Sequence, residues 1–454
     1  MSATRPLFVR LTLLGLLLVC SASMWIYWNL VPGALHAANV RTGLPGAKPL
    51  TDLYPRWYGT RELLLHHRDP YGVEVSREIQ IAYYGRALNP AVAADRLDQE
   101  RFAYPLYIIF LMLPTVPMEF DTVRIVVWWV LAAVVIVGVW VWLRFLRIQL
   151  SVIAGVAVFA VALSSLPVMQ GLSLLQLGLL VATLIGAAAW CAADGRLFLA
   201  GSLLALATIK PQMAVLPIAW FAMWTVGGWK QRRSLMWGFG TTLAVLISAS
   251  ELLLPGWLMR YPKALVAYSE YTNAKAFLGA ALPSGVFWVI AILAVLGVGV
   301  FCWKVRQEPA GTVWFAIALA FVLTLTVTIV PTVNASFNQV LLLPTFLLGI
   351  RHWSDIGRGN RLNRLTLYAM MGCAFLPWVL ALVVVIAQPE LRNGWYLAMW
   401  SAPIFSSSAL PVVALGFLIL LSRSVTANAA GHPDGKGGRV VAFGAVPGMD
   451  SVQR

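Results

Sequence analysis

Residues 51–72, TDLYPRWYGTRELLLHHRDPYG, gather acids, bases, histidines and aromatic side chains in a chain that is otherwise strongly apolar. The stretch comes shortly after the first long apolar segment, and Asp52 is the first acid to follow that segment. A carboxylate at this position, near the level of the membrane surface, can accept a proton from a hydroxyl group. A structural alternative is that Thr51 or Asp52 caps the N-terminus of a helix. The sequence therefore indicates a candidate general base at Asp52 and leaves the capping alternative open.

The loop around this stretch is rich in ionisable side chains but lacks a convincing metal-ligand pattern. Residues 32–102 hold eight of the eighteen acids and three of the five histidines. His66 and His67 are adjacent, so on a helix they would point apart rather than converge on one ion. The four cysteines all lie within apolar segments, without the spacing of a metal site or a disulfide framework. We therefore expect no metal and no cofactor.

The composition is that of a membrane protein. The chain has 454 residues, of which 60% are hydrophobic and 11% are charged, whereas about 25% of the residues of a soluble domain are charged. Apolar runs of about 20 residues, the length needed to span a bilayer as a helix, recur along the chain and do not alternate as outer-membrane strands would. The predicted fold class is therefore all-α, a polytopic helical membrane protein.

We expect about 11–12 transmembrane helices within a membrane domain that covers residues 1–423. The apolar segments fall at about 7–31, 122–143, 150–168, 172–192, 196–228, 235–254, 283–303, 311–331, 335–351, 364–387 and 398–422. The first of these is long enough to remain as an uncleaved anchor. The run 196–228 is too long for one ordinary span and is interrupted at IKPQ, where Pro211 disfavours helix at Lys210. It is either two helices with a break or one long kinked helix.

The segment 102–120 is apolar but short, and it contains three prolines. We interpret it as a re-entrant or interfacial helix on the outer face, with a true membrane span as the alternative.

The net charge of +15 is distributed at the ends of apolar runs rather than gathered as a nucleic-acid-binding patch. Basic clusters such as 229–234 and 351–364 are typical of cytoplasmic loops under the positive-inside rule. We therefore expect a multi-pass protein of the plasma membrane, with no nucleic-acid partner and with both termini in the cytoplasm. The tail 424–454, rich in Gly, Ala and Ser, is expected to be disordered. The segments 32–121 and 255–282 are then outer loops, the first of them partly helical.

Three motifs, in order, carry a resemblance to a known family. They are DLYPRWYGTRELLLHHRDPYG, then RFAYPLYIIFLMLPTVP, then QLGLLVATLIGAAAWCAADGRLFLAGSLLALATIKPQMAVLPIAW. With these motifs, which cover about residues 50–220, the chain resembles the multi-spanning glycosyltransferases of GT-C type that use polyprenyl-phosphate sugars. Within that type it is most similar to the glycosyltransferase family 87 group of mannosyltransferases.

The resemblance implies a specific reaction. A hexose would pass from a polyprenyl phosphate to a glycan or glycolipid acceptor of the cell envelope, on the outer face of the plasma membrane. Mannose is the first candidate for the hexose. In such enzymes an acid of the first outer loop is the catalytic base, and in this sequence that acid is Asp52. The reaction would be a single inverting displacement with the lipid phosphate as leaving group, which suits a chain without a phosphate-binding Gly-rich loop.

A leaving phosphate requires positive charge beside it. Lys210 is the first candidate because a lysine flanked by apolar residues is costly unless it has a partner; the alternative is snorkelling to the interface. Arg124 and Arg56 are the further candidates for the donor phosphate.

Four other residues are candidates for the cavity wall or for acceptor binding. Tyr54 and Tyr104 belong to the first outer loop, with a core aromatic role as the alternative for Tyr104. Arg260 and Lys263 belong to the second outer loop, which alternatively only covers the site.

Other interpretations remain open. The donor sugar is alternatively a different one, such as arabinose. Glu119 and Asp121 are alternative acids if Asp52 is only a cap. Outside the class, the chain is alternatively a transporter or flippase of a lipid-linked sugar, or a non-catalytic subunit in which Asp52 is dispensable. A transporter predicts interrupted helices in both halves of the chain, and in the sequence only the break at Lys210-Pro211 is clear.

Overall fold

The structure is a computed structural model. It describes residues 4–41, 50–89, 91–92, 100–272, 279, 282–330, 336–353, 356, 361–391 and 394–430. Throughout these residues the regular structure is helical, and no strand occurs among them. This confirms the predicted all-α class. Of the tail predicted from residue 424, the part up to Ala430 continues a helix and the remainder lies outside the described residues.

Six helical segments of the described chain are long and apolar enough to cross a bilayer. They lie in α1 (Thr4–Arg41), α5 (Phe120–Phe145), α11 (Trp229–Leu253), α14 (Ser284–Val305), α18 (Arg361–Ala387) and Tyr396–Thr426, which joins α19 (Tyr396–Ser406) to α20 (Leu410–Ala430). A seventh results if the pair α6 (Val152–Ser164) and α7 (Leu166–Ser173), bent by 52°, counts as one span. The other apolar segments form shorter helices: α8 (Gly178–Ala193), α9 (Leu197–Ala207), α10 (Pro211–Val226) and α15 (Val313–Ile329).

The long apolar run 196–228 is two helices rather than one kinked helix. Helix α9 ends at Ala207 and α10 begins at Pro211, which stands in the first turn, where its missing N–H costs nothing. The chain between them holds Lys210 with φ −128° and ψ 77°, outside the helical region. The second half is interrupted as well, between α19 and α20 and by the 3₁₀ helix η4 (Ser336–Leu342) before α16 (Leu343–Arg351). Interrupted helices therefore occur in both halves of the described chain, and the break at Lys210 is not a feature of the first half alone.

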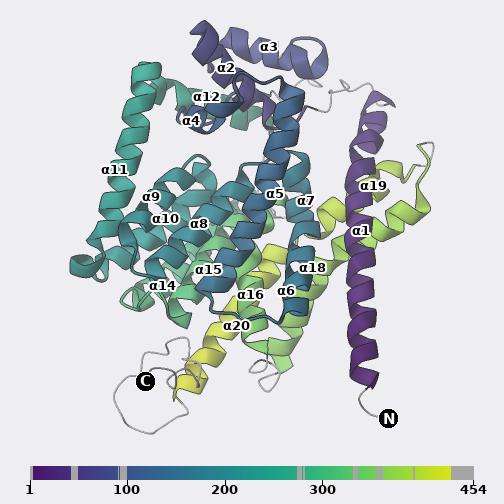
Figure 1. Cartoon of the computed structure of the whole chain (residues 1–454), viewed down its shortest axis with the longest axis vertical. Helices are drawn as coiled ribbons and strands as arrows, with labels where there is room; N and C mark the ends of the chain where they lie inside the picture. Colours follow the sequence, from purple (N-terminus) through teal and green to yellow (C-terminus); the bar gives the residue numbers. More distant parts are fainter. Residues whose placement is uncertain are drawn as a thin grey trace, which may run out of the picture.

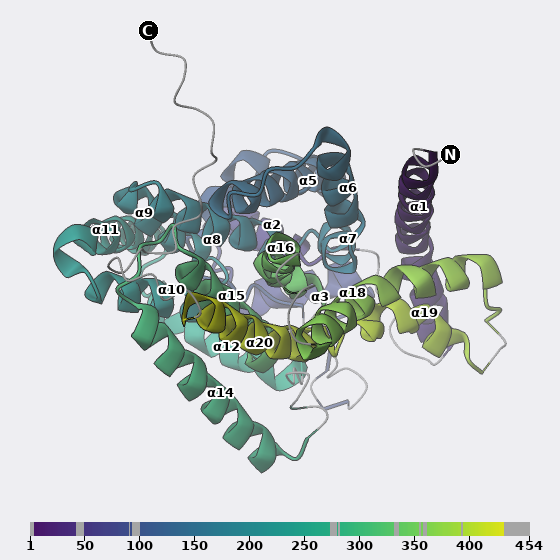
Figure 2. The same ribbon diagram turned by 90° about the horizontal axis from the view of Figure 1, so that it is seen from below.

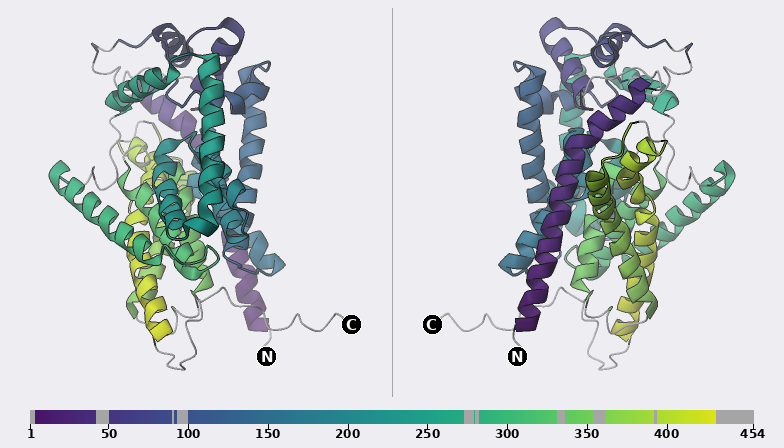
Figure 3. Two further views of the ribbon diagram at one scale, coloured as in Figure 1. Left: turned by 90° about the vertical axis from the view of Figure 1, so that its left-hand side faces the viewer. Right: turned by 90° about the vertical axis from the view of Figure 1, so that its right-hand side faces the viewer.

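The segment 102–120 does not form a spanning helix. It contains only α4 (Ile108–Met112) and the 3₁₀ helix η2 (Leu113–Thr115), which are far shorter than a bilayer crossing. Together with α2 (Tyr54–His66), α3 (Val73–Tyr84) and α12 (Trp257–Thr272), these helices form a layer across one end of the molecule (Figures 1 and 3). The two predicted outer loops thus meet in one cap. Helix α1 begins, and α20 ends, at the opposite end (Figure 1).

The core of the membrane domain surrounds α15 and α8. Almost every residue of α15 is buried, as is expected of a helix that is apolar on all sides. Seen from the end opposite the cap, α16 lies near the centre, with α5 and α6 on one side and α15 and α20 on the other (Figure 2). Helix α14 leans away from this body (Figures 2 and 3).

Helices α9 and α11 pack backbone against backbone through glycines. A Cβ atom on Gly201 would overlap the carbonyl oxygen of Leu235, and one on Gly238 would overlap the carbonyl oxygen of Phe198. Small residues permit such close approach between helices in a membrane. This packing fixes α9, and therefore the chain break that follows it.

Gly201→Ala should reduce the free energy of unfolding by about 1–3 kcal/mol, because the added methyl group overpacks a contact that consists of rigid backbone. Gly240→Ala is the matched control, since a Cβ at Gly240 meets no atom within 4 Å. Thermal unfolding in detergent measures both. Equal melting temperatures for the two variants would contradict the described packing.

Candidate active site

Asp52 does not cap a helix. The N-cap of α2 is Leu53, and no side chain donates or accepts a capping hydrogen bond there. The carbonyl of Thr51, rather than its side chain, accepts hydrogen bonds from the backbone of Tyr54 and from the hydroxyl of Tyr83. The capping alternative for Thr51 and Asp52 is therefore wrong.

The carboxylate of Asp52 instead begins a row of polar side chains that leads into the membrane domain. The Gln176 amide Nε2 donates to Asp52 Oδ2. The Lys210 Nζ donates to Gln176 Oε1 at 3.2 Å and to Asn338 Oδ1 at 2.9 Å. We call Asp52, Gln176, Lys210 and Asn338 the polar chain. It brings together four segments: the start of α2, the turn before α8, the break between α9 and α10, and η4.

The order of charges in the polar chain fixes the orientation of the Gln176 amide. The ammonium group of Lys210 can only donate hydrogen bonds, so the amide must turn its oxygen toward Lys210. Its NH₂ group then faces Asp52, and an ionised carboxylate can only accept. The reversed amide would set donor against donor and acceptor against acceptor. Lys210 therefore holds Asp52 through Gln176, although the two charged groups share no direct hydrogen bond among the described contacts.

Lys210 is buried, with 4% of its surface exposed. Its Nζ lies 4.7 Å from the ring centre of Phe337, a cation–π contact in addition to its two amide acceptors. A Cβ on Gly178 would stand 3.2 Å from this nitrogen and 3.1 Å from Asn338 Oδ1. The alternative for Lys210, snorkelling to the interface, is therefore wrong.

The surroundings of Asp52 act on its acidity in opposite directions. Burial raises the pKa of the Asp52 carboxyl above its ordinary value, while Arg56, then Lys210 and the hydrogen bond from Gln176 lower that pKa. Burial has the largest effect, so the net pKa is raised. A carboxylate with a raised pKa is a stronger proton acceptor than an exposed one.

Arg56 is the second cation beside Asp52. It lies on the first turn of α2, and its guanidinium carbon stands 4.1 Å from the ring centre of Tyr104. Its Nε is buried without a hydrogen-bond partner among the described residues. Tyr104 itself is 7% exposed and belongs to the main apolar core, so its environment is the core aromatic one that the sequence left as an alternative.

Arg124 lies apart from the polar chain, on the wall of a neighbouring cavity. It pairs with Asp121 at 3.4 Å; the side chain of Asp121 is largely exposed and that of Arg124 is partly exposed. The cavity has a volume of about 320 Å³, and its other lining residues include Thr51, Trp128, Ser173 and Leu175. Thr51 and Leu175 directly neighbour Asp52 and Gln176 in the sequence. This cavity therefore adjoins the Asp52 end of the polar chain.

The remaining candidates, Tyr54, Arg260 and Lys263, lie in the cap. Tyr54 packs against the rings of Tyr58, Tyr83 and Phe120 at centroid distances of 5.6, 5.7 and 4.9 Å. Arg260 donates to Asp69 Oδ2 at 3.0 Å, which joins the two outer loops. Lys263 is exposed. These contacts agree with a second outer loop that covers the site.

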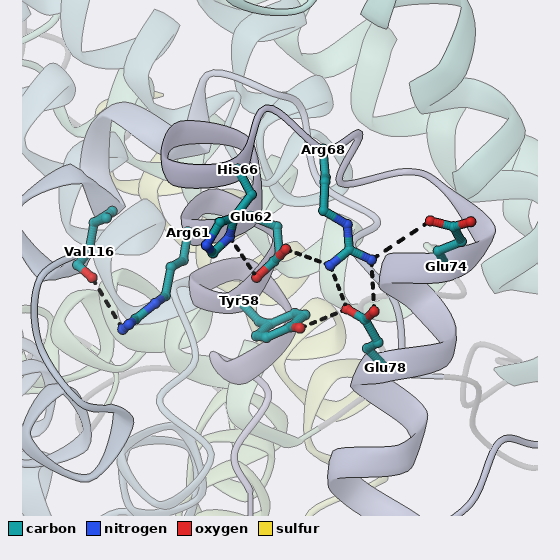
Figure 4. A network of polar contacts seen from close by, with 8 residues as sticks. All are labelled: Tyr58, Arg61, Glu62, His66, Arg68, Glu74, Glu78 and Val116. Atoms are coloured by element: carbon teal, nitrogen blue, oxygen red, sulfur yellow. Dashed lines mark hydrogen bonds and ion pairs between the residues drawn. The ribbon is translucent and has the colours of Figure 1, made fainter.

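An ionic network fixes α2 on α3 and thereby the position of Asp52. Arg68 bonds both Glu62 and Glu78 at 2.7 Å, and Tyr58 donates to Glu78 at 2.7 Å (Figure 4). The hydrogen bonds from Arg68 are the main reason that the pKa of Glu78 is lowered. Glu62, on α2, is 5% exposed and also pairs with His66. Arg68 thereby joins Glu62 of α2 to Glu78 of α3.

Sequence reasoning missed Gln176 and Asn338. Both are uncharged, and they lie 34 and 128 residues from Lys210 along the chain. The available signal was an amide inside an apolar run, LLQLGLL and SFNQVLL, where a polar side chain needs a partner. Across the described residues, no group of three or more His, Cys, Asp or Glu side chains is arranged to hold a metal ion.

Gln176→Leu should destabilise the protein by about 3–5 kcal/mol, because it strands the buried ammonium group of Lys210 and the carboxylate of Asp52. Gln176→Leu combined with Lys210→Met should recover a large part of this loss, since the double variant no longer buries the cation. Chemical unfolding in detergent compares the two, with Gln170→Leu as control for the loss of an amide elsewhere on the same segment. A double variant less stable than Gln176→Leu alone would contradict the polar chain.

Comparison with known proteins assigns the membrane domain to a family. The model of glycosyltransferase family 87 matches residues 102–331, half of the chain, which include Arg124, Gln176 and Lys210. Neither the curated proteins nor the solved structures provide a match. The matched region holds the broken helix and the turn before α8, and the expected resemblance is thereby confirmed. The chain belongs to glycosyltransferase family 87.

Proposed function

We propose that this membrane glycosyltransferase transfers a hexose from a polyprenyl phosphate to a hydroxyl group of an envelope glycan or glycolipid. Mannose is the first candidate for the hexose. The observation that carries the proposal is the polar chain together with Arg56. In the polar chain the Gln176 amide lies between a carboxylate with a raised pKa and a buried ammonium group, and the guanidinium group of Arg56 acts on the same carboxylate. A base and cations in one partly buried site are the two requirements of a displacement with a phosphate leaving group.

In the proposed reaction, Asp52 accepts the proton of the acceptor hydroxyl as its oxygen attacks the anomeric carbon. The bond between that carbon and the phosphate oxygen breaks, and the configuration inverts. Polyprenyl phosphate leaves as an anion, which Lys210 and Arg56 stabilise. Gln176 occupies Oδ2 of Asp52, which leaves Oδ1 as the oxygen for the proton.

The cavity beside Thr51 suits the acceptor. Its volume of about 320 Å³ lies within the range of ligand sites, about 300–1,000 Å³. Hydroxyl, charged and indole side chains line it, from Thr51, Asp121, Arg124, Trp128 and Ser173. Such a mixture offers hydrogen bonds to sugar hydroxyls and a ring face to the sugar's apolar side. Arg124 is accordingly proposed to contact the acceptor rather than the donor phosphate.

The orientation follows the distribution of basic residues. With the basic loops in the cytoplasm, the cap and Asp52 face the outside of the plasma membrane, and both termini lie inside. The site is then open to envelope acceptors and to the outer leaflet.

Asp52→Asn should reduce transfer from radiolabelled polyprenyl-phosphate mannose by roughly 10²–10⁴-fold, because the amide cannot accept the proton. The assay uses purified protein in detergent, and Glu119→Gln is the control for loss of an acid, because Glu119 is exposed and does not line the acceptor cavity. Equal rates for wild type and Asp52→Asn would remove Asp52 from the mechanism. Failure of the wild type to turn over any polyprenyl-phosphate sugar would favour the transporter or flippase alternative.

The rate of transfer should fall at low pH as Asp52 becomes protonated, and this fall should begin above the pH expected of an exposed aspartate, because burial raises the pKa. Lys210→Met removes a positive charge that lowers the pKa of Asp52, so the acid limb should move to higher pH. A pH–rate profile of the residual activity measures this shift. An acid limb unchanged or moved to lower pH would contradict the coupling.

A further inference from the structure

A second cavity lies inside the membrane domain and shares no lining residue with the cavity beside Thr51. It has a volume of about 270 Å³ and is lined by side chains of α5, α6, α7, α8, α16 and α18, nearly all of them apolar. Helices α5 and α18 are among the segments long enough to cross the bilayer. The cavity is therefore placed where hydrocarbon, rather than water, is the surrounding medium.

This cavity adjoins the Lys210 end of the polar chain. Leu179 and Gln339 belong to its wall, and each directly follows a residue beside Lys210, namely Gly178 and Asn338. On two separate segments, a residue of the cavity wall is thus the direct sequence neighbour of a residue that contacts the buried cation. That combination matches a lipid whose anionic group is attached directly to its hydrocarbon chain.

Four buried polar atoms on or next to the cavity wall lack hydrogen-bond partners in the described part of the chain. They are Gln339 Oε1, Ser407 Oγ and Trp378 Nε1 on the wall, and Asn338 Nδ2 next to Lys210. All four side chains are at least nine-tenths buried, and buried polar atoms are ordinarily paired. Asn338 Nδ2 is a donor next to an ammonium group, as a phosphate site needs. The pattern indicates a ligand with a polar end.

We propose that the cavity between α5, α6 and α18 binds the first isoprene units of the polyprenyl donor, with the phosphate held by Lys210 and Asn338. The inference rests on the proposed function, because the lipid is the donor of that reaction. It assigns the donor and the acceptor to opposite sides of the polar chain. The lipid enters beside Lys210, and the hydroxyl acceptor enters from the cavity at Thr51.

Filling the cavity tests this assignment. Ala374, on α18, lines the cavity, whereas Ala369, on the same helix, is exposed and does not. Ala374→Phe should weaken binding of radiolabelled undecaprenyl phosphate to the purified full chain by tenfold or more, and Ala369→Phe should leave it unchanged. Equal affinities for the two variants would overturn the proposal, and so would displacement of undecaprenyl phosphate by an equal concentration of phosphatidylglycerol.

Photolabelling locates the bound polyprenyl chain without requiring sugar transfer. An undecaprenyl phosphate with a diazirine in its second isoprene unit should label peptides of α5, α6 and α18 in the wild type, and this labelling should be lost in Ala374→Phe. Labelling confined to other helices would overturn the proposal. Because neither binding nor labelling requires sugar transfer, a protein that is labelled here but transfers no sugar would contradict the proposed function alone.

Discussion

The structure depends on one buried charge. Lys210 carries its ammonium group into an apolar domain, where an unpaired cation is expensive. Its partners are two amide oxygens from distant parts of the chain, and one of these amides passes the interaction on to Asp52. The break between α9 and α10, the glycine at the start of α8 and the short helix η4 all serve to bring these groups together.

The polar chain connects the two parts of the molecule. Asp52 belongs to the cap, whose helices are joined by Arg68 and its carboxylates and by Arg260 with Asp69. Lys210 belongs to the membrane domain, where family 87 is matched. In the proposed reaction, a hydroxyl acceptor would approach from the cap and a lipid from the bilayer, so a site at their boundary would serve both. The two cavities are lined by sequence neighbours of the polar chain, Thr51 and Leu175 in one and Gln339 in the other.

The sequence predicted much of this arrangement because a bilayer allows few alternatives. The apolar runs predicted helices because a membrane span must satisfy its backbone hydrogen bonds internally, and Pro211 predicted the break at Lys210. Asp52 was found because no acid precedes it in the chain. Gln176 and Asn338 were not found, since the pairing of neutral amides is a long-range property: Gln176 and Asp52 are 124 residues apart. Arg124 was predicted at the donor phosphate from its position in the sequence, and sequence position does not reveal the cavity that Arg124 lines.

An experimental density map of the full chain in a lipid nanodisc, at a resolution that shows side chains, tests the central claim most directly. The account predicts continuous density for the Gln176 amide between Asp52 and Lys210. A map in which Asp52 extends into open solvent, separated from both Gln176 and Lys210, would contradict it.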